Sequence, residues 1–107
     1  MADTLKHLEA TIRERRGNDP ALSYVAKLFA QGREKIVQKL GEEATETVIA
    51  ALGGDPDKLT GEAADLLFHL LVVLAEGGVS LDAVMAELER REGVSGLAEK
   101  AARQTET

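Results

Sequence analysis

The stretch "GEAADLLFHLLVVLAEGG", residues 61–78, decides the fold class of this chain. Its central run is apolar on nearly every side of a helical projection, which is typical of a buried helix. Its ionisable residues fall within one narrow arc of that projection, which contains Glu62, Asp65, His69 and Glu76. Such groups are costly on a buried helix unless they are paired or bind a metal. The stretch therefore predicts a helical core with a polar site along one edge.

Helical spacing recurs through the rest of the chain, and no segment shows the alternation expected of a strand. We predict an all-α helical bundle of about four to five helices. The predicted helices cover about 4–16, 24–30, 33–52, 58–76 and 81–91, with Ser23 and Ser80 as N-caps. The turn "GGDPDK", residues 53–58, should set the two long helices antiparallel. We expect a single domain over 1–107, with 93–107 as a weakly ordered tail.

Composition and charge narrow the class of protein. The chain has 107 residues and no cysteine, which excludes disulfides, thiolate zinc sites and a cysteine nucleophile. Its net charge of −6 argues against general nucleic-acid binding, which needs a basic face. The charged N-terminus is unlike a signal peptide, and the longest apolar run falls short of the roughly 18 residues that span a bilayer. We therefore expect a cytoplasmic protein without a nucleic-acid or membrane partner.

A chain of this length has few helices with which to cover an almost wholly apolar one. We expect a homodimer to bury the surplus apolar surface, and its two chains could share each site.

The first long helix has two contrasting faces in projection. One is an apolar stripe of Ile36, Leu40, Ala44, Val48 and Ala51. The other gathers the charged residues Lys35, Lys39, Glu42, Glu43 and Glu46. A solvated face is one explanation, but like charges stand four apart in Lys35–Lys39 and Glu42–Glu46, which slightly destabilises a helix. This arrangement favours a functional role for the carboxylates.

The two long helices each carry a pair of acids at helical spacing. Glu43 and Glu46 form E-x-x-E, and Glu62 and Asp65 form E-x-x-D. Fifteen residues that contain the turn separate the pairs, so a helical hairpin lets them face each other. Carboxylates without thiolates form a hard-oxygen site, which suits Mg²⁺ or, as a substitute, Mn²⁺. His69, one turn after Asp65, is either a further ligand or a buried support that hydrogen-bonds near the site.

Two longer strings resemble a known family. "SYVAKLFAQGREKIVQKLGEEATETVIAA", residues 23–51, and "GEAADLLFHLLVVL", residues 61–74, are similar to phosphoribosyl-ATP pyrophosphohydrolases of histidine biosynthesis. These are members of the all-α nucleotide pyrophosphohydrolase superfamily, and the likeness runs from Leu5 to "REGVSGLAEKAAR" at 91–103. The resemblance implies Mg²⁺-dependent cleavage of phosphoribosyl-ATP between its α and β phosphates, which gives phosphoribosyl-AMP and pyrophosphate. It also implies that the cyclohydrolase acting next is a separate chain.

Within that hypothesis, residues beside the acid pairs have expected roles. Glu42 or one of the four metal-binding acids would take the proton of the attacking water, with Glu42, Glu43 and Glu46 as the catalytic candidates. Ammonium groups would hold phosphate oxygens, and the candidates are Lys27, Lys35 and Lys39. Ser23 and Tyr24 would hydrogen-bond ribose or phosphate, although Ser23 is equally well explained as an N-cap.

Other functions remain open from the sequence. A hydrolase of the same superfamily could instead remove non-standard or deoxynucleoside triphosphates. A non-enzymatic helical dimerisation module would explain the apolar helices but not the carboxylates beside them. A di-iron bundle is disfavoured, because neither acid pair supplies the Glu-x-x-His that such sites use.

Overall fold

The computed structural model describes residues 3–92 and Arg103, and this part of the chain is helical without a strand. Five helices follow one another within residues 3–92: α1 Asp3–Arg15, α2 Tyr24–Gln31, α3 Arg33–Gly53, α4 Pro56–Glu76 and α5 Leu81–Arg91. The all-α prediction is confirmed, and each helix begins and ends within two residues of its predicted position. The expected tail, 93–107, lies outside the described residues apart from Arg103.

Local side chains explain where the helices begin. The hydroxyl oxygens of Ser23 and Ser80 each accept a hydrogen bond from the backbone N–H three residues later, at 3.2 and 3.1 Å. Helix α4 starts two residues before its predicted position, because Asp55 caps it and Pro56 suits the first turn of a helix. Gly54 precedes this cap with φ at 78°, a backbone conformation that glycine adopts without strain.

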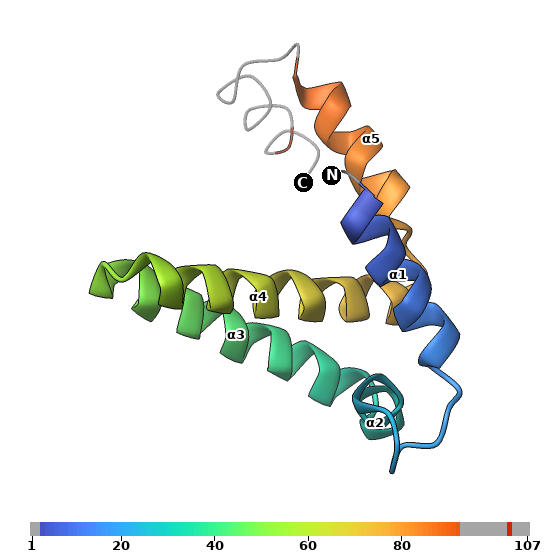
Figure 1. Cartoon of the computed structure of the whole chain (residues 1–107). Helices are drawn as coiled ribbons and strands as arrows, with labels where there is room; N and C mark the ends of the chain where they lie inside the picture. Colours follow the sequence, from blue (N-terminus) through green and yellow to red (C-terminus); the bar gives the residue numbers. More distant parts are fainter. Residues whose placement is uncertain (1–2, 93–102, 104–107) are drawn as a thin grey trace.

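Helices α3 and α4 form an antiparallel hairpin, as the turn between them predicted. Figure 1 shows the two helices side by side, joined at one end. At the other end, α1 and α5 rise together from α4, while α2 lies across the beginning of α3. The hairpin therefore projects as an arm from the corner where the remaining helices meet.

The hydrophobic core lies at this corner. It combines residues from all five helices: Ile12, Val25, Leu28, Ile36, Leu71, Val72, Ala75 and Leu81. Arginines close its edge, since Arg16 donates to the carbonyl oxygen of Ala75 at 3.3 Å and stacks 4.5 Å over the Phe29 ring. Arg33 forms a 2.6 Å ion pair with Glu76. These contacts hold α2 and the start of α3 against the end of α4.

The arm is less completely covered. Large apolar side chains are exposed along both of its helices: Val48, Ile49, Leu52, Leu67 and Leu70. Within a single chain, the prediction of α4 as a buried helix therefore holds only for residues 71–76, which are all buried or half-buried.

The predicted apolar stripe on α3 is largely exposed over its second half in this chain. Val48 is 58% exposed, whereas the buried residues of α3 are Ile36, Glu43 and Ala50. Successive steps of four residues rotate by about 40° around a helix, while steps of seven return almost to the same face. The face of α3 that packs on α4 therefore contains residues seven positions apart, namely Ile36, Glu43 and Ala50. Glu43, which was expected on the charged face, thus lies on the buried one.

Among the described residues, no single helix is long and apolar enough to cross a membrane. Helices α4 and α5 together meet that criterion by length and composition, but they are bent by 108° relative to each other.

Candidate metal centre

Three carboxylates converge between the two long helices. Glu43 from α3 and Glu62 and Asp65 from α4 each place an oxygen within 4.8 Å of the others. Glu43 is 5% exposed, and Oε2 of Glu43 and Oε2 of Glu62 are both buried without a hydrogen-bond partner. Buried carboxylate oxygens are costly when nothing neutralises them, and a second carboxylate nearby adds repulsion. Their oxygen-only chemistry fits a hard divalent cation.

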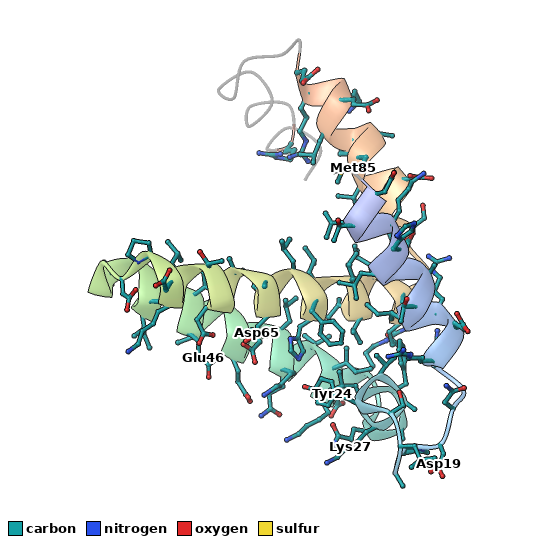
Figure 2. The ribbon with its side chains drawn as sticks, in the orientation of Figure 1. Asp19, Tyr24, Lys27, Glu46, Asp65 and Met85 are labelled. Carbon is teal, nitrogen blue, oxygen red and sulfur yellow. The ribbon has the colours of Figure 1, made fainter. Side chains whose placement is uncertain are left out.

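The fourth predicted metal ligand, Glu46, is not part of this group. It is exposed one turn along α3 from Glu43, where it lines a surface hollow with Glu42. Figure 2 shows Glu46 and Asp65 on the same side of the α3–α4 pair. The structure therefore brings together three of the four predicted acids within one chain and leaves Glu46 at the margin.

Thr47 joins the two helices at the level of the acids, and sequence reasoning missed it. Its hydroxyl lies 2.8 Å from the carbonyl oxygen of Glu43 and 3.2 Å from that of Glu62. The hydroxyl proton is thus shared between the backbones that carry two of the three acids. Its position four residues after Glu43 was the only signal in the sequence, and threonine commonly bonds that carbonyl in any helix.

A cavity of about 300 Å³ adjoins the acid cluster and collects the predicted phosphate-binding lysines. Its lining comprises Tyr24, Lys27, Leu28, Gln31, Lys35, Lys39 and Glu42. The ammonium of Lys39 connects the cavity to the acids, at 3.5 Å from Glu43 Oε1 and 3.8 Å from Glu42 Oε1. The charge of the Tyr24 phenolate raises the pKa of Lys39 most, burial partly opposes this, and the carboxylates of Glu43 and Glu42 raise the pKa further. Lys39 is therefore cationic at neutral pH. The cavity thus offers positive charge for an anion beside a site for a cation.

Glu42, one of the candidate bases, is exposed at the edge of the same cavity. Its carboxylate accepts a 3.0 Å hydrogen bond from the side-chain amide of Gln38. Ser23, in contrast, does not line the lysine cavity, and its hydroxyl oxygen caps α2. The N-cap prediction for Ser23 is confirmed, and its role in substrate binding stays a prediction.

His69 lies behind the acids and is buried, with an exposure of 6%. Its Nδ1 is 2.7 Å from the backbone carbonyl oxygen of Asp65, and its Nε2 is 3.0 Å from the Tyr24 hydroxyl. Both ring nitrogens are therefore engaged away from the carboxylates. This arrangement matches a supporting histidine rather than a further metal ligand.

Comparison with known proteins identifies the family. The family model described as "Phosphoribosyl-ATP pyrophosphohydrolase" matches residues 5–92, which include the whole acid cluster and the lysine cavity. The chain belongs to the phosphoribosyl-ATP pyrophosphohydrolase family. The resemblance predicted from the sequence is thereby confirmed.

Individual relatives agree with the family match. A phosphoribosyl-ATP pyrophosphatase of Rhizorhabdus wittichii is 68% identical over 103 residues, which cover 96% of this chain and 97% of the relative. Proteins of the same name from Erythrobacter litoralis and Novosphingobium aromaticivorans are 64% and 63% identical over 101 residues. These alignments cover 94% of this chain, and 97% and 94% of the two relatives.

Proposed function

We propose that this chain hydrolyses phosphoribosyl-ATP at a Mg²⁺ site formed by Glu43, Glu62 and Asp65. The family match and the named relatives support this substrate and the place of the reaction in histidine biosynthesis. The metal site rests on one observation, the two buried carboxylate oxygens that have no hydrogen-bond partner. Mn²⁺ could replace Mg²⁺, because both prefer oxygen ligands.

The lysine cavity supplies the anion-binding half of the site. Mg²⁺, when bound, neutralises phosphate oxygens and lowers the pKa of a coordinated water. Lys27, Lys35 and Lys39 border the cavity and can hold the phosphate chain by charge-assisted hydrogen bonds. Because Lys39 also contacts Glu43, phosphate bound there lies directly beside the acids.

In the hydrolysis itself, the oxygen of a water forms a bond to the α phosphorus while the bond from that phosphorus to the bridging oxygen breaks. Pyrophosphate leaves with the bridging oxygen. A carboxylate takes the proton of the water, and Glu42 and Glu46 are candidates, since both are exposed beside the acid cluster.

A homodimer would complete the molecule. The arm of α3 and α4 exposes apolar side chains on both helices within residues 3–92, and a second copy would remove them from water. We propose that the arm of one protomer packs against that of its partner, each protomer being a single domain. Action in the cytoplasm, and a separate cyclohydrolase for the following step, remain predictions.

The testing experiment measures pyrophosphate release from phosphoribosyl-ATP, ATP and a panel of deoxynucleoside triphosphates, with Mg²⁺ and with a chelator. We expect turnover of phosphoribosyl-ATP that requires the cation. Turnover of the deoxynucleotides instead would mean that the same metal site serves a hydrolase that removes non-standard or deoxynucleoside triphosphates.

A matched pair of variants tests the metal site separately. Glu62→Gln should abolish Mn²⁺ binding in calorimetry and abolish turnover, while Glu34→Gln, an exposed change on α3, should alter neither. Full activity of Glu62→Gln would refute the proposed site.

A further inference from the structure

The lysine cavity lies between two helices, and only one of them carries a proposed metal ligand. Lys35 and Lys39 come from α3, the helix of Glu43, so their place relative to that acid is set by the geometry of a single helix. Lys27 comes from α2, a helix of 8 residues that contains none of the acids. Gly32, with φ at 91°, separates α2 from α3. The position of Lys27 relative to the acids therefore depends on what holds α2 against the other helices.

One side chain of α2 is linked to the backbone beside the acids on α4. The Tyr24 hydroxyl lies 3.0 Å from Nε2 of His69, and Nδ1 of the same ring lies 2.7 Å from the backbone carbonyl oxygen of Asp65. A phenol hydroxyl can both donate and accept, so its hydrogen bond with His69 forms whichever of the two groups carries the proton. Tyr24 is thus connected to the backbone of a proposed metal ligand through one buried side chain.

The ring of Tyr24 and the rest of α2 have contacts that do not involve this hydroxyl. The ring stacks on Phe68, with centroids 6.0 Å apart and an angle of 26° between the planes. Val25 and Leu28 anchor α2 in the hydrophobic core. Tyr24→Phe would therefore remove the bond to His69 while the ring contact and the anchoring of α2 remain.

Lys27 lies one helical turn after Tyr24, so the two side chains share a face of α2, and both border the lysine cavity. Tyr24 is the first residue of this short helix. A shift of α2 that moves Tyr24 away from His69 consequently moves the Lys27 ammonium as well. Misplacing a binding group by about 1 Å can cost about 100-fold in rate, so a bond that fixes this helix matters for the cavity.

Resting on the proposed function, we infer that Tyr24 is a positioning residue for Lys27. Its hydrogen bond with His69 holds α2 so that the Lys27 ammonium and the cation bound by the acids contact the same phosphate chain. The hydroxyl acts on the anion-binding half of the site through a residue of its own helix, and Lys35 on α3 does not depend on it. Tyr24 takes no part in bond breaking.

Two double-mutant cycles on kcat/KM for phosphoribosyl-ATP test this role. The first combines Tyr24→Phe with Lys27→Ala. The second is the matched control and combines Tyr24→Phe with Lys35→Ala, which removes a lysine of the same cavity from α3. Lys27→Ala should lower kcat/KM by roughly 10- to 100-fold in wild type, and by a factor at least about twofold smaller in Tyr24→Phe. Lys35→Ala should cause the same loss in both backgrounds.

Calorimetric titration with Mn²⁺ in the absence of substrate separates an effect on the lysine from an effect on the acids. Tyr24→Phe leaves the contact between His69 and the Asp65 carbonyl in place. Its Mn²⁺ affinity should therefore equal that of wild type.

Three outcomes would overturn the inference. Additive losses in the first cycle would mean that the Tyr24 hydroxyl does not act through Lys27, as is expected if it binds ribose or phosphate directly. Equal coupling in the two cycles would mean that removing the hydroxyl loosens the whole cavity. Weaker Mn²⁺ binding by Tyr24→Phe would place its role at the acids instead.

Failure of the proposed function is distinguishable, because wild type would then not turn over phosphoribosyl-ATP at all. The same two cycles, measured on the affinity for inorganic pyrophosphate with Mg²⁺, would in that case still decide whether Tyr24 positions Lys27.

Discussion

The Thr47 hydroxyl lies 3.2 Å from the carbonyl oxygen of Glu62, on the opposite helix and fifteen positions away along the chain. This polar contact crosses the interface between α3 and α4 at the level of the three clustered acids. The same hydroxyl lies 2.8 Å from the carbonyl oxygen of Glu43 in its own helix. Thr47 therefore links the backbones of two proposed metal-binding residues across the two helices.

Thr47→Val should weaken metal binding with a small loss of stability. Valine keeps the shape but removes the shared proton, at a cost of about 1 kcal/mol in the free energy of unfolding. Thr45→Val is the matched control, because the Thr45 hydroxyl bonds only the Gly41 carbonyl within α3. Calorimetric titration with Mn²⁺ and thermal unfolding of both variants check this. Equal Mn²⁺ affinity for the two variants would contradict the positioning role of Thr47.

Glu43→Gln should stabilise the metal-free protein and remove its stabilisation by metal. The substitution takes one charge from a crowded group of carboxylates, of which Glu43 is the most buried. We expect a higher Tm than wild type in chelator and no further rise with Mg²⁺. In wild type, saturating Mg²⁺ should raise Tm, because a ligand that binds only the folded state stabilises it. A lower Tm for metal-free Glu43→Gln than for metal-free wild type would indicate that the three carboxylates do not destabilise the protein by repelling one another.

Lys39→Ala should mainly raise the KM for phosphoribosyl-ATP. A charge-assisted hydrogen bond contributes about 1.5–3 kcal/mol, which corresponds to roughly 10- to 100-fold. Lys58→Ala, at an exposed position near the start of α4, serves as control and should leave KM unchanged. Steady-state kinetics on both variants measure the KM for phosphoribosyl-ATP. Weakened metal binding with an unaltered KM would refute a phosphate role for Lys39.

Tyr24 should titrate above its ordinary pKa of 10.0 in the folded protein. It is the only tyrosine and there is no tryptophan, so the ultraviolet absorbance of phenolate reports this one residue. Because the pKa of Tyr24 is raised on folding, its contribution to stability is present below the unfolded pKa and is lost as pH rises through the folded one. Unfolding curves should therefore show stability falling above about pH 10, and less steeply for Tyr24→Phe. A midpoint at or below that of the denatured chain would contradict the burial of the phenol.

Ile49→Glu should produce monomers if the exposed arm is the dimer interface. The Ile49 side chain is 65% exposed in one chain, so the charge costs little in a monomer but is costly at a buried apolar contact. Leu22→Glu is the control, since Leu22 is 86% exposed and lies before α2, away from the arm. Light scattering after size-exclusion chromatography measures the mass of each. A monomeric wild type, or a dimer unaffected by Ile49→Glu, would refute this interface.

The sequence by itself determined the helices, because the signals that begin and end them are local. Ser23, Ser80 and the "GGDPDK" turn act within a few residues of their own position, and the helix ends followed them to within two residues. The acid pairs were recognisable for the same reason, since E-x-x-E and E-x-x-D place neighbours on one helical face.

Only the tertiary structure decided which of these acids meet. Helix α3 turns Glu43 into the seam and leaves Glu46 outside, a rotation set by packing against α4 rather than by any local preference. The pairing of Tyr24 with His69, 45 positions apart, likewise depends on how α2 is held against α4. Residue spacing determines which side chains share a face of a helix. Which way that face points depends on how the helix rotates to bury apolar surface against its neighbours, and this is settled only when the helices pack together.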